Sequence, residues 1–187
     1  MRKMMIAFTS LILGMVSRAE GNQILKPFDQ RKKTIQAENV SSAKPSILNL
    51  SWSDIETSSK QLAVSLKERN WAGILAITRG GLVPAGLLAE SLNIRRIETI
   101  NVQSYDKEKK RGEITLLNVP DIKNAGENWL IVDDLVDSGE TVKAVKKLFP
   151  KAVYAVLFAK PKGLSMVDHF VREVGQDTWI VFPWEKE

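Results

Sequence analysis

The stretch Leu130-Ile131-Val132-Asp133-Asp134-Leu135-Val136-Asp137-Ser138-Gly139-Glu140-Thr141 decides the fold class. Its apolar beginning predicts a buried strand over Trp129–Asp133, and the residues after the turn predict a helix from about Thr141 to Phe149. A strand that turns directly into a helix is typical of α/β sheets, in which ligands bind beyond the carboxyl ends of the strands.

The same alternation of strands and helices continues on both sides of this stretch. Apolar or alternating runs predict further strands over Gly73–Thr78, Arg96–Ser104, Ile114–Asn118, Ala152–Ala159 and Thr178–Phe182. Helices are predicted from a capping box of Ser53 and Glu56 to about Arg69, and over Ala85–Leu92 after Pro84. Trp52 and Trp71 are expected in the core. The prediction is an α/β fold with an open, mainly parallel twisted sheet flanked by helices.

Composition excludes several classes of protein. The chain has 187 residues, enough for one ordinary domain, and it contains no cysteine, which rules out a disulfide scaffold and a thiol nucleophile. Its net charge of +5 lies entirely in residues 1–50, which hold eight Lys/Arg and three Asp/Glu, while residues 51–187 hold 19 of each sign. We therefore expect no nucleic-acid partner for the globular part.

The first residues form a segment of their own. Arg2-Lys3 precedes the apolar run Met4–Val16, and a polar stretch follows to about Ser46. This outline fits a secretory signal, an organellar or membrane-surface targeting segment, or residues added by an upstream start. We expect residues 1–48 to be an N-terminal extension and 49–187 to be one globular domain. The expected location is cytoplasmic, with a peripheral membrane contact or targeting left open.

The turn from Asp133 to Thr141 carries the chemistry. The hydroxyls of Ser138 and Thr141, with backbone N–H groups at the helix start, form a natural cradle for phosphate, and Gly139 allows close approach of the backbone. Asp133 and Asp134 put two carboxylates beside it, where ribose hydroxyls or hydrated Mg²⁺ would lie. For single residues, a solvated strand end and a helix N-cap at Asp137 remain the alternative.

Together with other blocks, this string resembles the PRPP-binding signature of the type I phosphoribosyltransferases, where PRPP is phosphoribosyl pyrophosphate. The resemblance runs from about Leu50 to Trp184 and is greatest to the bacterial xanthine-guanine branch. The blocks that carry it are Thr78-Arg79-Gly80-Gly81-Leu82-Val83-Pro84, Ser104-Tyr105-Asp106, Phe158-Ala159-Lys160-Pro161 and Gln176-Asp177-Thr178-Trp179-Ile180. It implies the type I fold with a small base-recognition hood, and a homodimer or homotetramer.

The resemblance also implies roles at the PRPP site. Arg79 and Gly80 would form the pyrophosphate loop, with a cis peptide at Arg79-Gly80. Arg111, in a charged loop that covers the site in relatives, would meet pyrophosphate as well. The PRPP-binding set would be Arg79, Gly80, Arg111, Asp133, Asp134, Asp137, Ser138, Gly139, Glu140 and Thr141, with Mg²⁺ as the cofactor and Asp134 as its ligand. Glu140 departs from the glycine of the bacterial branch.

For the base, the resemblance implies that Lys160 donates to a purine 6-oxo group, that Trp179 stacks on the ring, and that main-chain groups of Trp179 and Ile180 address its 2-position. Asp137 would handle the proton at N7, with Asp133 and Arg79 as the other catalytic residues. The implied reaction transfers the 5-phosphoribosyl group of PRPP to N9 of guanine or xanthine, and more weakly hypoxanthine, giving GMP or XMP and pyrophosphate. The alternatives are hypoxanthine-guanine specificity and a PRPP-fold regulator that binds nucleotides or RNA.

Overall fold

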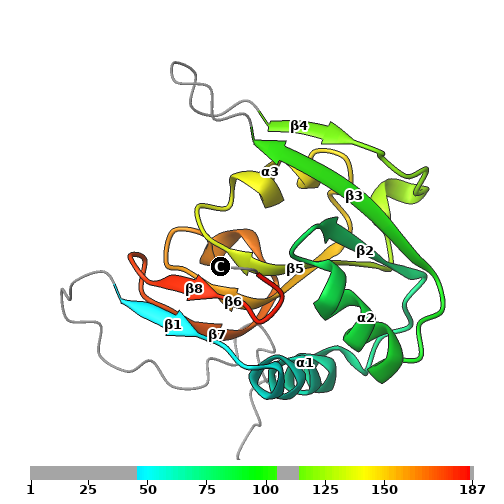
Figure 1. Ribbon diagram of the computed structural model, residues 1–187. Coiled ribbons are helices and arrows are strands. Elements are labelled where there is room, and N and C mark those ends of the chain that lie inside the picture. Colours follow the sequence, from blue (N-terminus) through cyan, green and yellow to red (C-terminus); the bar gives the residue numbers. More distant parts are fainter. Residues whose placement is uncertain (1–45, 105–113, 186–187) are drawn as a thin grey trace, which may run out of the picture. The chain divides into compact units, whose positions relative to one another are not determined.

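A six-stranded sheet forms the centre of the fold (Figure 1). The computed structural model describes residues 46–104 and 114–185. The strand order is β4-β3-β2-β5-β6-β7, and every neighbouring pair is parallel except β3 and β4. Its strands are β2 (Gly73–Thr78), β3 (Ile97–Ser104), β4 (Ile114–Leu117), β5 (Trp129–Val136), β6 (Val153–Ala159) and β7 (His169–Glu173). The predicted open, mainly parallel α/β sheet is confirmed.

Helices cover both faces of this sheet. The helices are α1 (Trp52–Leu66), α2 (Leu82–Ser91) and α3 (Glu140–Lys146), with short 3₁₀ turns at Asn124–Gly126 and Leu164–Met166. One core packs α1 and α2 against alternate residues of the strands, such as Ile74 and Leu130. The other core packs α3 against the intervening residues, such as Leu75 and Ile131. Both faces of β2 and β5 are therefore buried, as their continuous apolar runs require.

A second sheet consists of two parallel strands, and the predicted small hood stays a prediction. This sheet pairs β1 (Ile47–Asn49) with β8 (Trp179–Val181). The sequence predicted β8 as a further strand but did not predict β1 or β7. No helix within residues 46–104 and 114–185 is long and apolar enough to cross a membrane. The predicted domain boundary at residue 48 stays a prediction, and residues 1–45 of the predicted extension lie outside the described residues.

The start of α1 differs from the prediction. Ser51, not Ser53, is the N-cap: the Asp54 N–H donates to the Ser51 hydroxyl at 3.2 Å, and the Ser51 N–H donates to the Asp54 carboxylate at 2.8 Å. The capping box therefore uses Asp54 at its third position and starts the helix two residues earlier. The helix ends at Leu66 rather than near Arg69.

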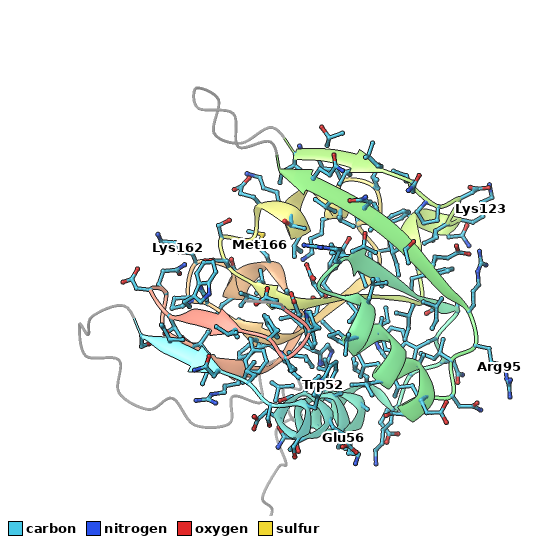
Figure 2. All side chains as sticks on the ribbon, in the orientation of Figure 1. Trp52, Glu56, Arg95, Lys123, Lys162 and Met166 are labelled. Atoms are coloured by element: carbon cyan, nitrogen blue, oxygen red, sulfur yellow. The ribbon has the colours of Figure 1, made fainter. Side chains whose placement is uncertain are left out.

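Two further predictions on packing have opposite outcomes. Trp52, the first residue of α1, is 57% exposed and lies tilted against Trp184 with ring centroids 6.0 Å apart, so its predicted place in the core is wrong (Figure 2). Trp71 packs against the core as predicted, and its indole N–H donates to the Leu66 carbonyl at 3.0 Å.

Helix α2 begins at Leu82 instead of Ala85, which places Pro84 within its first turn. Helix α3 is shorter than predicted and ends at Lys146.

Candidate active site

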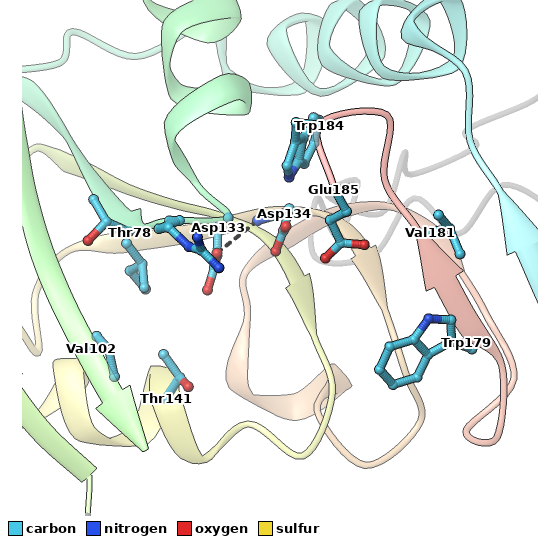
Figure 3. A pocket seen from close by; sticks show the side chains of 12 residues that line it. Thr78, Val102, Asp133, Asp134, Thr141, Trp179, Val181, Trp184 and Glu185 are labelled. Carbon is cyan, nitrogen blue, oxygen red and sulfur yellow. Dashed lines mark hydrogen bonds between the residues drawn. The ribbon is translucent and has the colours of Figure 1, made fainter. Parts of the chain in front are cut away.

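A cleft of about 1050 Å³ opens at the carboxyl ends of β2 and β5 (Figure 3). The sheet register explains the opening. The pairing of β2 with β5 stops at Ala76 and Val132, whereas β5 stays paired with β6 as far as Val136 and Ala159. The edge of β5 beyond Val132 therefore faces the cleft. The cleft is lined by Ile77, Thr78, Arg79, Gly80, Val102, Asp133, Asp134, Thr141, Trp179, Val181, Trp184 and Glu185.

Asp133 and Asp134 stand on this free edge, within the last four residues of β5. The backbone N–H of Asp134 donates to the Asp133 carboxylate at 3.0 Å. Burial, and then the neighbouring Asp134 carboxylate, raise the pKa of Asp133 well above its usual range. Burial also raises the pKa of Asp134, to about 6, with a further contribution from the carboxylate of Glu185. Two carboxyl groups thus line the cleft, and a bound cation would favour their charged forms.

The loop after β2 presses directly on Asp134. A Cβ atom added at Gly80 would lie 2.5 Å from both carboxylate oxygens of Asp134. A Cβ at Gly81 would collide with the Val132 carbonyl oxygen. Both glycines are therefore required by close approach between this loop and β5. The cis peptide bond lies at Thr78-Arg79, one residue before the predicted Arg79-Gly80 position, so that prediction is wrong by one residue.

The turn between β5 and α3 places the remaining predicted PRPP residues. Gly139 adopts φ +84°, and a Cβ there would lie 2.5 Å from Met166. Thr141 reaches the cleft, whereas Ser138 and Glu140 are exposed outside its lining. The Glu140 carboxylate lies 4.0 Å from the Lys143 ammonium along the exposed face of α3. Arg111, the other predicted pyrophosphate ligand, lies outside the described residues.

Asp137 does not cap α3, since Gly139 is the N-cap residue. Its carboxylate instead receives two hydrogen bonds from other segments. The Lys160 ammonium donates to Oδ2 at 2.9 Å, and the Gln176 amide donates to Oδ1 at 2.6 Å. Lys160, directly after β6, is only 7% exposed, so this cation is held in place by its burial as well as by its partner. The predicted Asp137 and Lys160 are thus brought together.

The two predicted residues on β8 have different surroundings. Trp179 is 68% exposed and lines the cleft, which leaves its ring available to a flat ligand. Its backbone N–H already donates to the Ser46 carbonyl at 2.8 Å, so that N–H is not free for a base. Ile180 is 6% exposed, and its side chain packs in the core. Only main-chain groups of Ile180 can therefore contribute to recognition, as expected.

Sequence reasoning did not assign roles to several cleft residues. Trp184 stacks on Phe182, with ring centroids 4.8 Å apart, and stands above Asp134 beside Glu185 (Figure 3). These residues lie near the end of the chain, where no periodic pattern marks them. Gln176 was part of a block that carried the resemblance, but nothing in its sequence context indicates the bond to Asp137, 39 positions away.

The fold and this site define a nucleotide-processing α/β protein with an acidic strand end and a glycine loop beside it. Residues 47–187 match the phosphoribosyl transferase domain. The chain belongs to the phosphoribosyltransferase family.

Individual relatives support this membership. The chain is 50% identical over 139 residues to a xanthine-guanine phosphoribosyltransferase of Desulfotalea psychrophila, covering 74% of this chain and 86% of the relative. Among solved structures, it is similar to a purine phosphoribosyltransferase of Pyrococcus horikoshii, with TM-score 0.65, 28% identity and coverage of 75% and 95%. A Helicobacter pylori xanthine-guanine-hypoxanthine phosphoribosyltransferase gives TM-score 0.64 at 26% identity, covering 74% and 94%.

Proposed function

We propose that this chain transfers the 5-phosphoribosyl group of PRPP to N9 of guanine or xanthine, and more weakly hypoxanthine, releasing pyrophosphate. The observation that carries this proposal is the Asp137–Lys160 pair, with a hydrogen-bond acceptor and a buried donor 2.9 Å apart. A 6-oxopurine with its proton on N7 presents a donor and an acceptor side by side on one edge. Asp137 would accept the N7 proton while Lys160 donates to O6.

The same pair disfavours adenine. The 6-amino group of adenine presents donors, which would face the donors of the Lys160 ammonium. The exposed ring of Trp179, on the wall of the cleft that Asp133 and Asp134 also line, offers a surface on which a purine can stack. The Desulfotalea psychrophila relative is named for xanthine and guanine, and both of these bases are 6-oxopurines. These features together favour a 6-oxopurine acceptor.

PRPP would occupy the cleft itself. Arg79 supplies a fixed positive charge for pyrophosphate, and Gly80 brings its backbone close to Asp134. The turn with Ser138 and Thr141 would hold the 5-phosphate, and Asp133 with Asp134 would face the ribose hydroxyls. As the N9–C1′ bond forms and the bond from C1′ to the pyrophosphate oxygen breaks, the N7 proton passes to the Asp137 carboxylate.

We propose Mg²⁺ as the cofactor, with Asp134 as its protein ligand. Within the described ranges, no group of three or more His, Cys, Asp or Glu side chains is placed to hold a metal ion. This suits Mg²⁺, which keeps several waters and binds through one or two carboxylates together with substrate phosphates. Bound Mg²⁺ would disperse the charge that grows on the leaving pyrophosphate. The raised pKa values of Asp133 and Asp134 fit such a site, because a cation favours their charged forms.

Initial rates with PRPP, Mg²⁺ and each of guanine, xanthine, hypoxanthine and adenine test the proposal. We expect turnover with guanine and xanthine, less with hypoxanthine and none with adenine. Higher rates with hypoxanthine than with xanthine would instead indicate hypoxanthine-guanine specificity. No pyrophosphate release, with RNA binding that weakens steeply with salt, would indicate a regulator. The predicted homodimer or homotetramer and the cytoplasmic location, with or without peripheral membrane contact, stay predictions.

The role of Asp137 has its own test. Asp137→Asn keeps the size of the side chain but cannot take the N7 proton, so we expect kcat with guanine to fall by about 10²-fold or more. Circular dichroism and the melting temperature would show that the variant is folded. Wild-type turnover by folded Asp137→Asn would contradict the assigned role.

A further inference from the structure

Asp137 is held from two sides, and only one of its partners belongs to the site proposed for the base. Lys160 binds Oδ2 at 2.9 Å, whereas Gln176 binds Oδ1 at 2.6 Å. The Asp137 side chain is 52% exposed and follows the end of β5 in a turn. A short side chain on such a turn would rotate about its χ angles without partners on both oxygens. The second partner is therefore required for a fixed carboxylate plane.

The orientation of the Gln176 amide is set by a third segment. The backbone N–H of Lys162 donates to the Gln176 amide oxygen at 3.0 Å, which leaves the amide nitrogen directed at Asp137. Lys162 lies in the connection after β6 (Figure 2). Gln176 lies in the connection between β7 and β8. One amide thus links the turn after β5, the loop after β6 and the loop that leads to Trp179.

We propose that Gln176 is a positioning residue for the transfer reaction, which holds the Asp137 carboxylate in the orientation in which it can accept the purine N7 proton. The inference rests on the proposed function of Asp137. With one donor on each oxygen, the carboxylate keeps further lone pairs free for the base proton. Among the described residues, Lys160 is the charged side chain that bonds to this carboxylate.

Gln176 also connects proton handling with base stacking. Only two residues separate it from Trp179, and the loop between them is closed by the Thr178 N–H, which donates to the Gly175 carbonyl at 3.0 Å. A shift of Gln176 away from Asp137 would therefore move the loop that carries the aromatic ring. Positioning of the carboxylate and of the ring would be lost together, whereas PRPP contacts at Arg79 would be unaffected.

Gln176→Glu is the discriminating variant. It keeps the side-chain length and the acceptor for the Lys162 N–H, but it replaces the donor toward Asp137 by a carboxylate. Two adjacent carboxylates disfavour each other's ionisation, so the pair retains a proton to higher pH. We expect the acid limb of the kcat/KM profile with guanine to move up by about one pH unit. At pH 7, kcat should fall about tenfold, with the KM for PRPP unchanged.

Two further variants separate positioning from a merely structural role. Gln176→Met removes both hydrogen bonds at similar size and should also lower kcat, whereas the exposed Gln61→Glu on α1 introduces the same change of charge and should keep the wild-type profile. If Gln176 served only to anchor the loop, Gln176→Glu would keep the wild-type rate and pH profile while Gln176→Met lost activity. That pattern would overturn the inference.

Asp137→Asn, assayed in the same series, distinguishes this inference from the proposed function. If Asp137→Asn is inactive while folded Gln176→Glu and Gln176→Met both show the wild-type rate and profile, the positioning role is wrong and the proposed function stands. If Asp137→Asn turns over like the wild type, the transfer activity stands, but the proton-accepting role of Asp137 and the positioning role of Gln176 are both wrong. If the inference is right, the double variant of Asp137→Asn with Gln176→Glu loses little beyond the single Asp137→Asn change, because both residues act through one carboxylate.

Discussion

Replacing Asp134 by asparagine should stabilise the free protein at neutral and alkaline pH. The Asp134 carboxyl has a pKa raised from 3.8 to about 6, first by burial and then by the Glu185 carboxylate. A carboxyl whose pKa is higher in the folded state binds its proton more tightly there than in the unfolded chain. Folding is therefore penalised as pH rises between these two values, and the penalty stays constant above the folded pKa.

The size of the effect follows from the same shift. Each pKa unit corresponds to about 1.36 kcal/mol, so a rise from 3.8 to about 6 costs at most about 3 kcal/mol above pH 7. Well below pH 3.8 the carboxyl is protonated in both states, and the cost disappears. The asparagine side chain of the variant would carry no charge at any pH and would still accept hydrogen bonds. Some pH dependence remains in the variant, because the pKa of Asp133 is also raised by burial.

Urea unfolding at pH 4, 6 and 8, without PRPP and divalent cations, measures this difference. Asp134→Asn should exceed the wild type only slightly at pH 4 and increasingly toward pH 8. The matched control is Asp121→Asn, whose side chain is 79% exposed and should give no comparable pH-dependent gain. If Asp134→Asn is no more stable than the wild type at pH 8, or if its advantage is equally large at pH 4, the reasoning is refuted.

Two further substitutions test the loop and the base site. Gly80→Ala would place a methyl 2.5 Å from the Asp134 carboxylate oxygens, so we expect kcat/KM for PRPP to fall by about 10²-fold. The control is Gly86→Ala, which should keep the wild-type rate because its added methyl meets nothing within 4 Å. Lys160→Met should lower kcat/KM for guanine by about 10- to 100-fold through loss of a charged donor, with the exposed Lys162→Met as control. Steady-state rates measure both, and wild-type values for Gly80→Ala or Lys160→Met would contradict the assigned contacts.

The parts of the fold that were predicted from sequence are those with a strong local signal. The strand Gly73–Thr78 was predicted to the residue, because its apolar run is continuous and a turn follows at once. β1 has three residues, and the His169–Glu173 strand mixes polar with apolar side chains, so neither shows a period. The capping box was misplaced by two residues because Ser51 and Ser53 both precede an acid three positions on, and only the backbone geometry separates them.

The residues of the candidate site also fall into two groups, those that a local sequence signal predicts and those whose position depends on distant contacts. Asp133 and Asp134 could be predicted because a parallel sheet brings the carboxyl ends of its strands to one edge, whatever the rest of the chain does. Gln176 and Glu185 reach the site from loops and the C-terminal segment, where position depends on contacts between distant residues. The resemblance supplied the roles of Lys160 and Trp179, which their sequence context alone did not distinguish from an emerging lysine and a core tryptophan.

This division has a physical consequence for the proposed reaction. The PRPP side is built on the rigid edge of the sheet, where Gly80 and Asp134 are pressed together and leave little freedom. The base side depends on one amide that joins two loops to Asp137. A substitution in those loops should therefore alter base specificity and proton handling while sparing PRPP binding, because the sheet edge does not depend on their contacts.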